Sequence, residues 1–149
     1  MAGDGGDLRE TTIIVKGNTT NTANDATLND DPDLTFSVKA NERILFESIL
    51  YYTALAGGIQ ISINGPAFAF LLFSVEIIDP TPGLVGFARA SAYDTPAILA
   101  GASSGITKVC GYVVTTAAGN LVIRWAQQAA NANNTTMSIG SWIKLSRVF

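Results

Sequence analysis

The stretch "LTFSVKANERILFESILYYTALAGGIQISIN", residues 34–64, decides the fold class. Apolar and polar side chains alternate in residues 34–39, and Ile59, Ile61 and Ile63 share one face near the end of the stretch. A period of two is the repeat of a β-strand with one buried face. Residues 43–55, between these segments, are apolar on both faces, and turns with Asn or Gly separate the three parts. The stretch therefore predicts three consecutive strands.

Strand-like segments continue on both sides of this stretch. They are rich in Val, Ile, Thr, Phe and Tyr, and clusters of Gly, Pro, Asn or Asp interrupt them about every ten residues, as in a sandwich or barrel. The further predicted strands are residues 11–16, 67–75, 84–90, 106–116, 120–127 and 141–149. Helical periodicity is weak and confined to residues 124–132. We expect an all-β fold.

Three polar or glycine-rich segments are expected to be loops. Residues 16–33 and 127–136 are rich in Asn, Thr, Ala and Asp, whose short side chains bond to nearby backbone and favour turns. Residues 101–105, "GASSG", predict a flexible tip.

The segment "AFAFLLFSV", residues 67–75, is apolar on both faces. As a strand, it places Phe68 and Phe70 on one face and Leu71 and Phe73 on the other. Such a strand must be covered on both faces. We expect the second sheet to cover one face and a neighbouring subunit the other. The alternative, a buried helix, is disfavoured by the Pro and Gly residues on both sides.

Length and composition indicate one domain. The chain has 149 residues, 48% of them hydrophobic and 14% charged, and we expect part of this apolar surplus in a subunit contact. The glycine-rich residues 1–10 predict a flexible arm, and residues 11–149 a single sandwich domain. No apolar stretch approaches the ~20 residues of a membrane-spanning helix, and the start lacks a secretory signal. We expect a soluble protein made in a cytoplasm, without a membrane partner.

Several classes of chemistry lack the residues they need. Histidine is absent, which excludes Ser-His-Asp and Cys-His catalysis and imidazole metal sites. The single cysteine, Cys110, lies in a β-branched run and predicts a small buried core residue. A net charge of −3 without runs of Lys or Arg argues against a nucleic-acid partner. A paired-carboxylate hydrolase is the remaining enzymatic alternative; we expect no enzyme and no cofactor.

The acidic residues Asp25, Asp30, Asp31 and Asp33 are the one plausible cation site in the sequence. A hard cation needs several converging oxygen ligands, and this segment lacks the glycine and the distal glutamate of an EF-hand loop. We predict a solvated turn before the strand at Leu34 and no metal site. The alternative is a structural Ca²⁺ or Mg²⁺ held by Asp30, Asp31 and Asp33.

Aromatic side chains in the apolar strands are the expected core or interface anchors, because aromatic rings bury large areas. They are Phe68, Phe70, Phe73, Trp125, Trp142 and Phe149. Stacking of Trp125 or Trp142 on a sugar is the alternative.

Three stretches resemble a widespread family of small virion proteins of tailed bacteriophages. They are "LNDDPDLTFSVKANERILFESILYYTA" (28–54), "ISINGPA" (61–67) and "GNLVIRWAQQAANANNTTMSIGSWIKLSRVF" (119–149). In that family an Asp-containing turn leads into a core strand. The chain closes with a G-N-L-x-x-x-W-A-Q strand, a Thr/Asn/Ala loop and a G-S-x-L/I-x-L-x-R strand. Residues 68–116 match only in strand-like character.

The resemblance implies a jelly-roll or tumour-necrosis-factor-like β-sandwich that trimerises, and it brings no catalytic residues. We therefore expect a jelly-roll-like antiparallel β-sandwich that forms a homotrimer. Its closing hairpin would end in an inner strand that holds Phe149.

Members of the family serve as capsid decoration proteins, head fibres, or tail-associated and receptor-binding modules. The short arm at residues 1–10 has neither heptads nor the shaft of a fibre, which favours decoration. We expect a cement protein on the capsid surface of the virion, bound as a trimer to the major capsid protein and made in the host bacterium. The alternative is a head-fibre or tail-associated module that binds a host receptor or carbohydrate.

Overall fold

The computed structural model describes residues 10–81 and 85–148, and this part of the chain forms strands, turns and loops without a helix. The strands are β1 (Glu10–Val15), β2 (Thr20–Thr22), β3 (Asn29–Val38), β4 (Arg43–Ala54), β5 (Ile59–Asn64), β6 (Phe68–Ile78), β7 (Val85–Ala90), β8 (Ala97–Leu99), β9 (Ser103–Thr115), β10 (Gly119–Ala126), β11 (Thr135–Met137) and β12 (Trp142–Val148). Among the described residues, no helix is long and apolar enough to cross a membrane.

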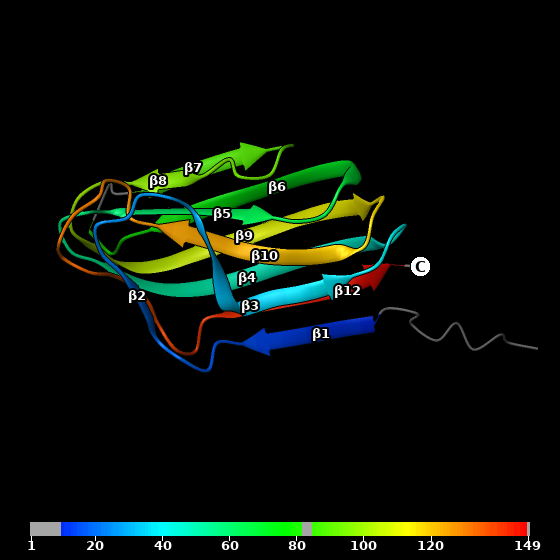
Figure 1. The fold of residues 1–149 in the computed structure, drawn as a ribbon, viewed down its shortest axis with the longest axis horizontal. Coiled ribbons are helices and arrows are strands. Elements are labelled where there is room, and N and C mark those ends of the chain that lie inside the picture. Colours follow the sequence, from blue (N-terminus) through cyan, green and yellow to red (C-terminus); the bar gives the residue numbers. More distant parts are fainter. Residues whose placement is uncertain (1–9, 82–84, 149) are drawn as a thin grey trace, which may run out of the picture.

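The strands form two antiparallel sheets packed face to face, which confirms the predicted all-β sandwich (Figure 1). The larger sheet has eight strands in the order β1-β12-β4-β9-β6-β7, with β11 pairing β4 and β2. The smaller sheet has four strands in the order β3-β10-β5-β8. Contacts between β1 and β3 and between β7 and β8 join the sheets along their two sides.

The strand order is that of a jelly roll. Strands β1-β12-β4-β9 of the larger sheet lie against β3-β10-β5-β8 of the smaller one, and the chain passes between the sheets as the two Greek keys of a jelly roll require. The β6–β7 hairpin is inserted between β5 and β8 and extends the larger sheet beyond β9. The two added strands widen the larger sheet by roughly 10 Å, since neighbouring strands lie roughly 4.8 Å apart.

Alternating side chains fill the space between the sheets. On β5, Ile59, Ile61 and Ile63 are buried, and residues 34–38 of β3 alternate between buried and accessible positions as predicted. From the larger sheet, Phe46 and Phe73 point inward and are buried. The hydrophobic core is therefore one continuous layer between the two sheets.

Gly111 on β9 makes room for two aromatic rings of that core. It pairs with Phe46 on β4 and with Phe73 on β6. A Cβ at position 111 would collide with the ring of Phe46 and would lie 2.7 Å from the Cβ of Phe73. The absence of a side chain at this position on β9 thus leaves room for the ring of Phe46 and the Cβ of Phe73 from the two flanking strands.

The three predicted loops are shorter than expected. Residues 16–33 contain β2 and the start of β3, and residues 127–136 contain the start of β11. The short β2 and β11 pair with each other, and β11 also pairs with the end of β4. Strand β9 begins at Ser103, inside the segment predicted as a flexible tip. Hydrogen bonding to strands distant in the sequence makes these polar segments β-strands, although their composition is typical of loops.

Strand β12 lies between β1 and β4 and is an inner strand, as predicted. The predicted closing hairpin is wrong, because β10 belongs to the smaller sheet and pairs with β3 and β5. Phe149, which this strand was expected to hold, lies outside the described residues. The arm predicted at residues 1–10 also lies outside them, apart from Glu10, which begins β1.

Candidate functional site

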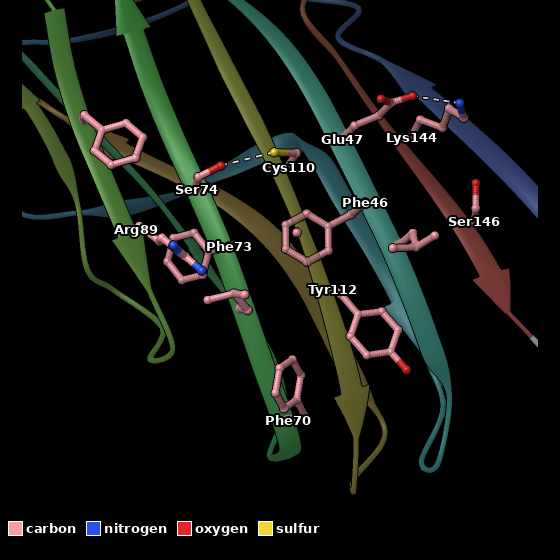
Figure 2. A pocket seen from close by; sticks show the side chains of 14 residues that line it. Phe46, Glu47, Phe70, Phe73, Ser74, Arg89, Cys110, Tyr112, Lys144 and Ser146 are labelled. Atoms are coloured by element: carbon pink, nitrogen blue, oxygen red, sulfur yellow. Dashed lines mark hydrogen bonds and ion pairs between the residues drawn. The ribbon is translucent and has the colours of Figure 1, made fainter.

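The side of the larger sheet that faces away from the smaller sheet is largely apolar. We call this surface the outer face, and Figure 2 shows its central part. The side chains that line its centre are Leu45 and Glu47 on β4, Phe70, Leu72 and Ser74 on β6, Phe87 and Arg89 on β7, Cys110 and Tyr112 on β9, and Lys144 and Ser146 on β12. The charged residues Lys108 and Glu76 lie on the same side, between Ile49 and Phe87. The antiparallel registers of β12, β4, β9, β6 and β7 bring these residues side by side.

Large apolar side chains of the outer face are exposed to solvent. Phe87 is 63% exposed, Phe70 50% and Leu45 45%. Isolated exposed hydrophobic residues are common in proteins, but a contiguous exposed apolar patch marks an interaction surface. The ring centroids of Phe70 and Tyr112 lie 5.8 Å apart, so aromatic side chains from neighbouring strands touch within this patch.

The outer face is hollowed. The depression has a volume of about 840 Å³, and the backbone of β9 at Gly111 lies on its floor. Figure 2 shows Phe70 and Tyr112 toward one end of the depression and Glu47 with Lys144 toward another side. Its size and aromatic lining suit the insertion of side chains from another protein.

A polar row crosses the outer face. Lys144, Glu47, Cys110, Ser74 and Arg89 are consecutive register partners from β12 to β7. Within this row the Lys144 ammonium lies 2.7 Å from the Glu47 carboxylate, and the Ser74 hydroxyl lies 3.1 Å from the Cys110 sulfur. Polar groups inside an apolar patch fix the orientation of whatever covers it, because a misaligned partner would leave them unsatisfied.

The outward side of the smaller sheet has a different character. Its strands carry Thr35, Ser37, Asn120, Arg124 and Gln60 on that side. Here Arg124 donates a hydrogen bond of 2.8 Å to Asp94, which together with the nearby Asp30 raises the pKa of the guanidinium. The apolar surplus of the sequence is therefore concentrated on the larger sheet.

The structure separates the predicted anchors into two groups. Phe73 and Trp125 are core residues, with 1% and 6% of their surfaces exposed. Phe70 and Trp142 point away from the smaller sheet, Phe70 on the outer face and Trp142 between its pairing partners Val15 and Ile49. The prediction that residues 67–75 present apolar side chains on both faces is confirmed for Leu71 to Phe73.

Phe68 does not share a face with Phe70, so that part of the prediction is wrong. The pairing of β6 with β9 shifts register between these two residues, and such a bulge reverses the direction of one side chain. Phe68 packs against the core, with its ring edge-on to Tyr93 at a centroid distance of 5.1 Å. Burial raises the pKa of Tyr93 to about 12.

The prediction that Cys110 is buried is also wrong, because its side chain is exposed on the outer face. Val109 and Val113 take the inward positions of β9, and Cys110 lies between them on the opposite side of the strand. The sequence carried a signal for this direction, because Lys108 and Tyr112 lie two residues before and after Cys110 and therefore on the same side of the strand.

The four acidic residues do not converge on one point, although Asp31 and Asp33 both contact Lys16. Asp31 is buried and contacts Lys16, whereas Asp30 lies on the other side of the strand with one carboxylate oxygen 2.9 Å from Nε of Arg124. Asp25 accepts hydrogen bonds from the Thr27 backbone and from Asn29, and these lower its pKa. The expectation of a solvated turn before Leu34 is therefore wrong, because β3 already begins at Asn29 and Asp31 is buried within it. Within residues 10–81 and 85–148, no group of three acidic, His or Cys residues could hold a metal ion.

A second hollow, of about 200 Å³, lies beside β2 and the start of β3. Its lining is mostly polar and comprises Thr20, Asn21, Thr22, Asn29, Asp30, Pro32 and Trp125. This hollow is the part of the structure where a tryptophan adjoins the Asn- and Thr-rich segments of the sequence.

The fold and the outer face define a jelly-roll β-sandwich with an inserted hairpin and an exposed apolar sheet face. No family model matches the sequence, and no curated protein matches it. Among solved structures, a chain of the tripod from the baseplate of bacteriophage Tuc2009 is 15% identical, with a TM-score of 0.30 over 88% of this chain and 64% of that chain. A chain of infectious bursal disease virus, Gx strain, is 9% identical, with a TM-score of 0.27 over 95% of this chain and 41% of that one. The chain thus spans less than two thirds of either neighbour.

Proposed function

We propose that the protein is a structural component of a tailed-bacteriophage virion, a capsid decoration protein that binds the outer capsid surface as a homotrimer. The observation that carries the proposal is the exposed apolar outer face of the larger sheet, described above for Leu45, Phe70 and Phe87. The sequence resemblance to small virion proteins supports the same role. The role is mechanical: bound trimers stabilise the shell, because any ligand of the assembled state favours that state.

In this proposal, neighbouring copies of the chain cover the outer face. A closed cyclic assembly gives every copy the same contacts, and an apolar sheet face extended by the β6–β7 hairpin offers one continuous area for them. The aromatic residues Phe70 and Phe87 would be the central anchors. The polar row from Lys144 to Arg89 would set the orientation of the copies.

Leu72→Glu is expected to convert the trimer into folded monomers at micromolar concentration. Leu72 lies in the outer face and is 36% exposed in the single chain, so a carboxylate there would be buried unpaired in the assembly. Ile98→Glu is the matched control, because Ile98 is 49% exposed on the smaller sheet and should leave the trimer intact. Light scattering after size-exclusion chromatography gives the mass; a monomeric wild-type protein would refute self-association.

The position on the virion is tested by copy number. Quantitative densitometry of purified virions should give a number of copies comparable to that of the major capsid protein, because a decoration protein covers the whole shell. Capsids stripped of the protein should open at lower temperature and regain resistance when it is added back. A few trimers per particle would contradict decoration and assign the protein to a vertex, fibre or tail.

The alternative function is a head-fibre or tail-associated module that binds a host receptor or carbohydrate. The observation that favours it is the polar hollow beside β2, where Asn21, Asn29 and Asp30 adjoin Trp125. Asn and Asp side chains with an aromatic neighbour are groups that bind sugar hydroxyls. Retention on host cell envelopes that is lost in Asn21→Ala and Asn29→Ala, together with a low copy number, would favour this function over decoration.

A further inference from the structure

A lysine and an aspartate are in contact inside the sandwich, where charged side chains are rare. Lys16 follows the last residue of β1, and Asp31 lies near the start of β3. Neither side chain is accessible to solvent, and the lysine Nζ lies 2.9 Å from each carboxylate oxygen of Asp31. The contact joins the larger sheet to the smaller one at one side of the sandwich.

The backbone of β3 bulges to bring Asp31 inside. In the pairing with β10, Thr35 lies opposite Val122 and Asp30 opposite Arg124, so β3 uses more residues than its partner over this interval. The two backbone N–H groups of the bulge, those of Asp33 and Leu34, donate to Oδ1 of Asp31 at 3.0 and 3.2 Å. The chain therefore surrounds this carboxylate with its own donors.

The two oxygens of Asp31 have different surroundings. Oδ1 accepts the two backbone N–H bonds, which is the arrangement of an oxyanion hole. Oδ2 accepts a hydrogen bond of 3.0 Å from the indole Nε1 of Trp125. A second carboxylate, that of Asp33, lies 3.4 Å from Nζ of Lys16 and is 26% exposed. The cluster thus holds a nucleophilic nitrogen, an acyl carbon, donors for a developing oxyanion and a carboxylate that can carry protons.

We propose that Lys16 and Asp31 condense to form an intramolecular amide bond, an isopeptide cross-link between β1 and β3. This modification site is separate from the outer face, and the inference goes beyond the proposed function. The ion pair of Lys16 with Asp31 is the arrangement from which the condensation would start.

The reaction is a dehydration that needs no further reagent. A proton passes from the Lys16 ammonium to Oδ2 of Asp31, which leaves a neutral amine and a carboxylic acid. The nitrogen lone pair attacks Cγ and forms the N–C bond, while negative charge develops on Oδ1 and is stabilised by the N–H groups of Asp33 and Leu34. The Asp33 carboxylate takes a second proton from nitrogen and delivers it to Oδ2. The C–O bond then breaks, and one water molecule leaves.

Burial supplies the conditions that this condensation requires. Removing two opposite charges from water is costly, and proton transfer within the pair relieves that cost and produces the reactive neutral forms. Fixed contact between amine and carboxyl replaces a bimolecular encounter, for which effective concentrations reach about 10⁵–10⁸ M in well-oriented systems. Both side chains are inaccessible to solvent, so the site also excludes the water that would drive hydrolysis.

The mass of the intact protein tests the proposal. Purified full-length protein, kept folded at neutral pH and then denatured for mass spectrometry, should be lighter than its sequence by one water molecule. Trypsin should fail to cleave after Lys16, and digestion should release a branched peptide that contains both Lys16 and Asp31. Asp31 cannot lose water by cyclising on the next residue, because Pro32 has no N–H. A wild-type protein of full sequence mass would overturn the proposal.

Variants identify the participating groups. Lys16→Arg keeps a cation but cannot form the bond, so it should retain the full mass; water loss that persists in this variant would overturn the proposal. Asp31→Asn should lose ammonia in place of water and reach the same final mass as the wild-type product. Asp33→Asn should slow the mass change at least tenfold, whereas Asp30→Asn, a neighbouring acid outside the cluster, should leave its rate unchanged.

Discussion

Trp125→Ala is expected to lower the free energy of unfolding by about 3–5 kcal/mol, the usual cost of removing a large buried aromatic side chain. Trp125 is 6% exposed and lies on β10 opposite Ile61 of β5. The substitution leaves a cavity between the sheets and removes the N–H that donates to Asp31. Because a domain of this size has a total stability of about 5–15 kcal/mol, the variant should be close to unfolding at physiological temperature.

The second tryptophan provides the control. Trp142 is only partly buried and points away from the smaller sheet, so Trp142→Ala should cost about 1 kcal/mol or less in a single chain. Both variants are best compared by urea denaturation in the Leu72→Glu background, where the outer face does not bind other copies. Equal losses for the two tryptophans would contradict the assignment of Trp125 to the core.

Asp31→Ala is expected to cost about 3–5 kcal/mol, because it removes the buried carboxylate that pairs with the ammonium of Lys16. Only the Asp33 carboxylate, which is partly exposed and 3.4 Å from Nζ, then remains beside that ammonium. The loss is large because the side chains of Lys16 and Asp31 are inaccessible to solvent. In addition, Oδ1 of Asp31 accepts hydrogen bonds from the backbone N–H groups of Asp33 and Leu34 in the β3 bulge. The same substitution removes the acyl group of the proposed isopeptide bond. Compared with wild-type protein that carries this bond, the variant therefore loses still more stability.

Asp30→Ala is the matched control, one residue away on the same strand. Asp30 is 63% exposed and forms an ion pair with Arg124 at the surface. Such pairs contribute about 0–1 kcal/mol, so the expected loss is below about 1 kcal/mol. Thermal and urea denaturation of both variants measure the difference. A small loss for Asp31→Ala would show that the lysine finds solvent or another partner when the carboxylate is gone.

Side-chain alternation explains which parts of the fold could be predicted. Where one face of a strand is apolar and the other polar, as at residues 34–38 and at Ile59 to Ile63, the sequence identifies both the strand and its buried side. The inner position of β12 was also expected. The apolar side chains expected on both faces of residues 67–75 are found at Leu71, Leu72 and Phe73, whereas the cover of the second face by a neighbouring subunit stays a prediction.

Most of the errors have a common physical cause, which is that bulges and long-range pairing are set by distant strands. The bulge that turns Phe68 inward depends on the register of β6 against β9. Cys110 is a different kind of error, because Lys108 two residues earlier shares its side of β9 and already indicated that this side faces away from the core. Asp31 is buried because two residues from distant parts of the chain donate hydrogen bonds to its carboxylate: Lys16, which follows β1, and Trp125 on β10. No local property of "NDDPD" distinguishes Asp31 from Asp30.

The position of β12 has a consequence for how the protein is made. During translation β1 and β4 leave the ribosome long before the strand that joins them, because β12 is the last strand in the chain and pairs with both. Until then β1 lacks the strand that it pairs with and the edge of β4 toward β12 is open, so both can pair with other nascent chains. The larger sheet is therefore completed only after β12 emerges.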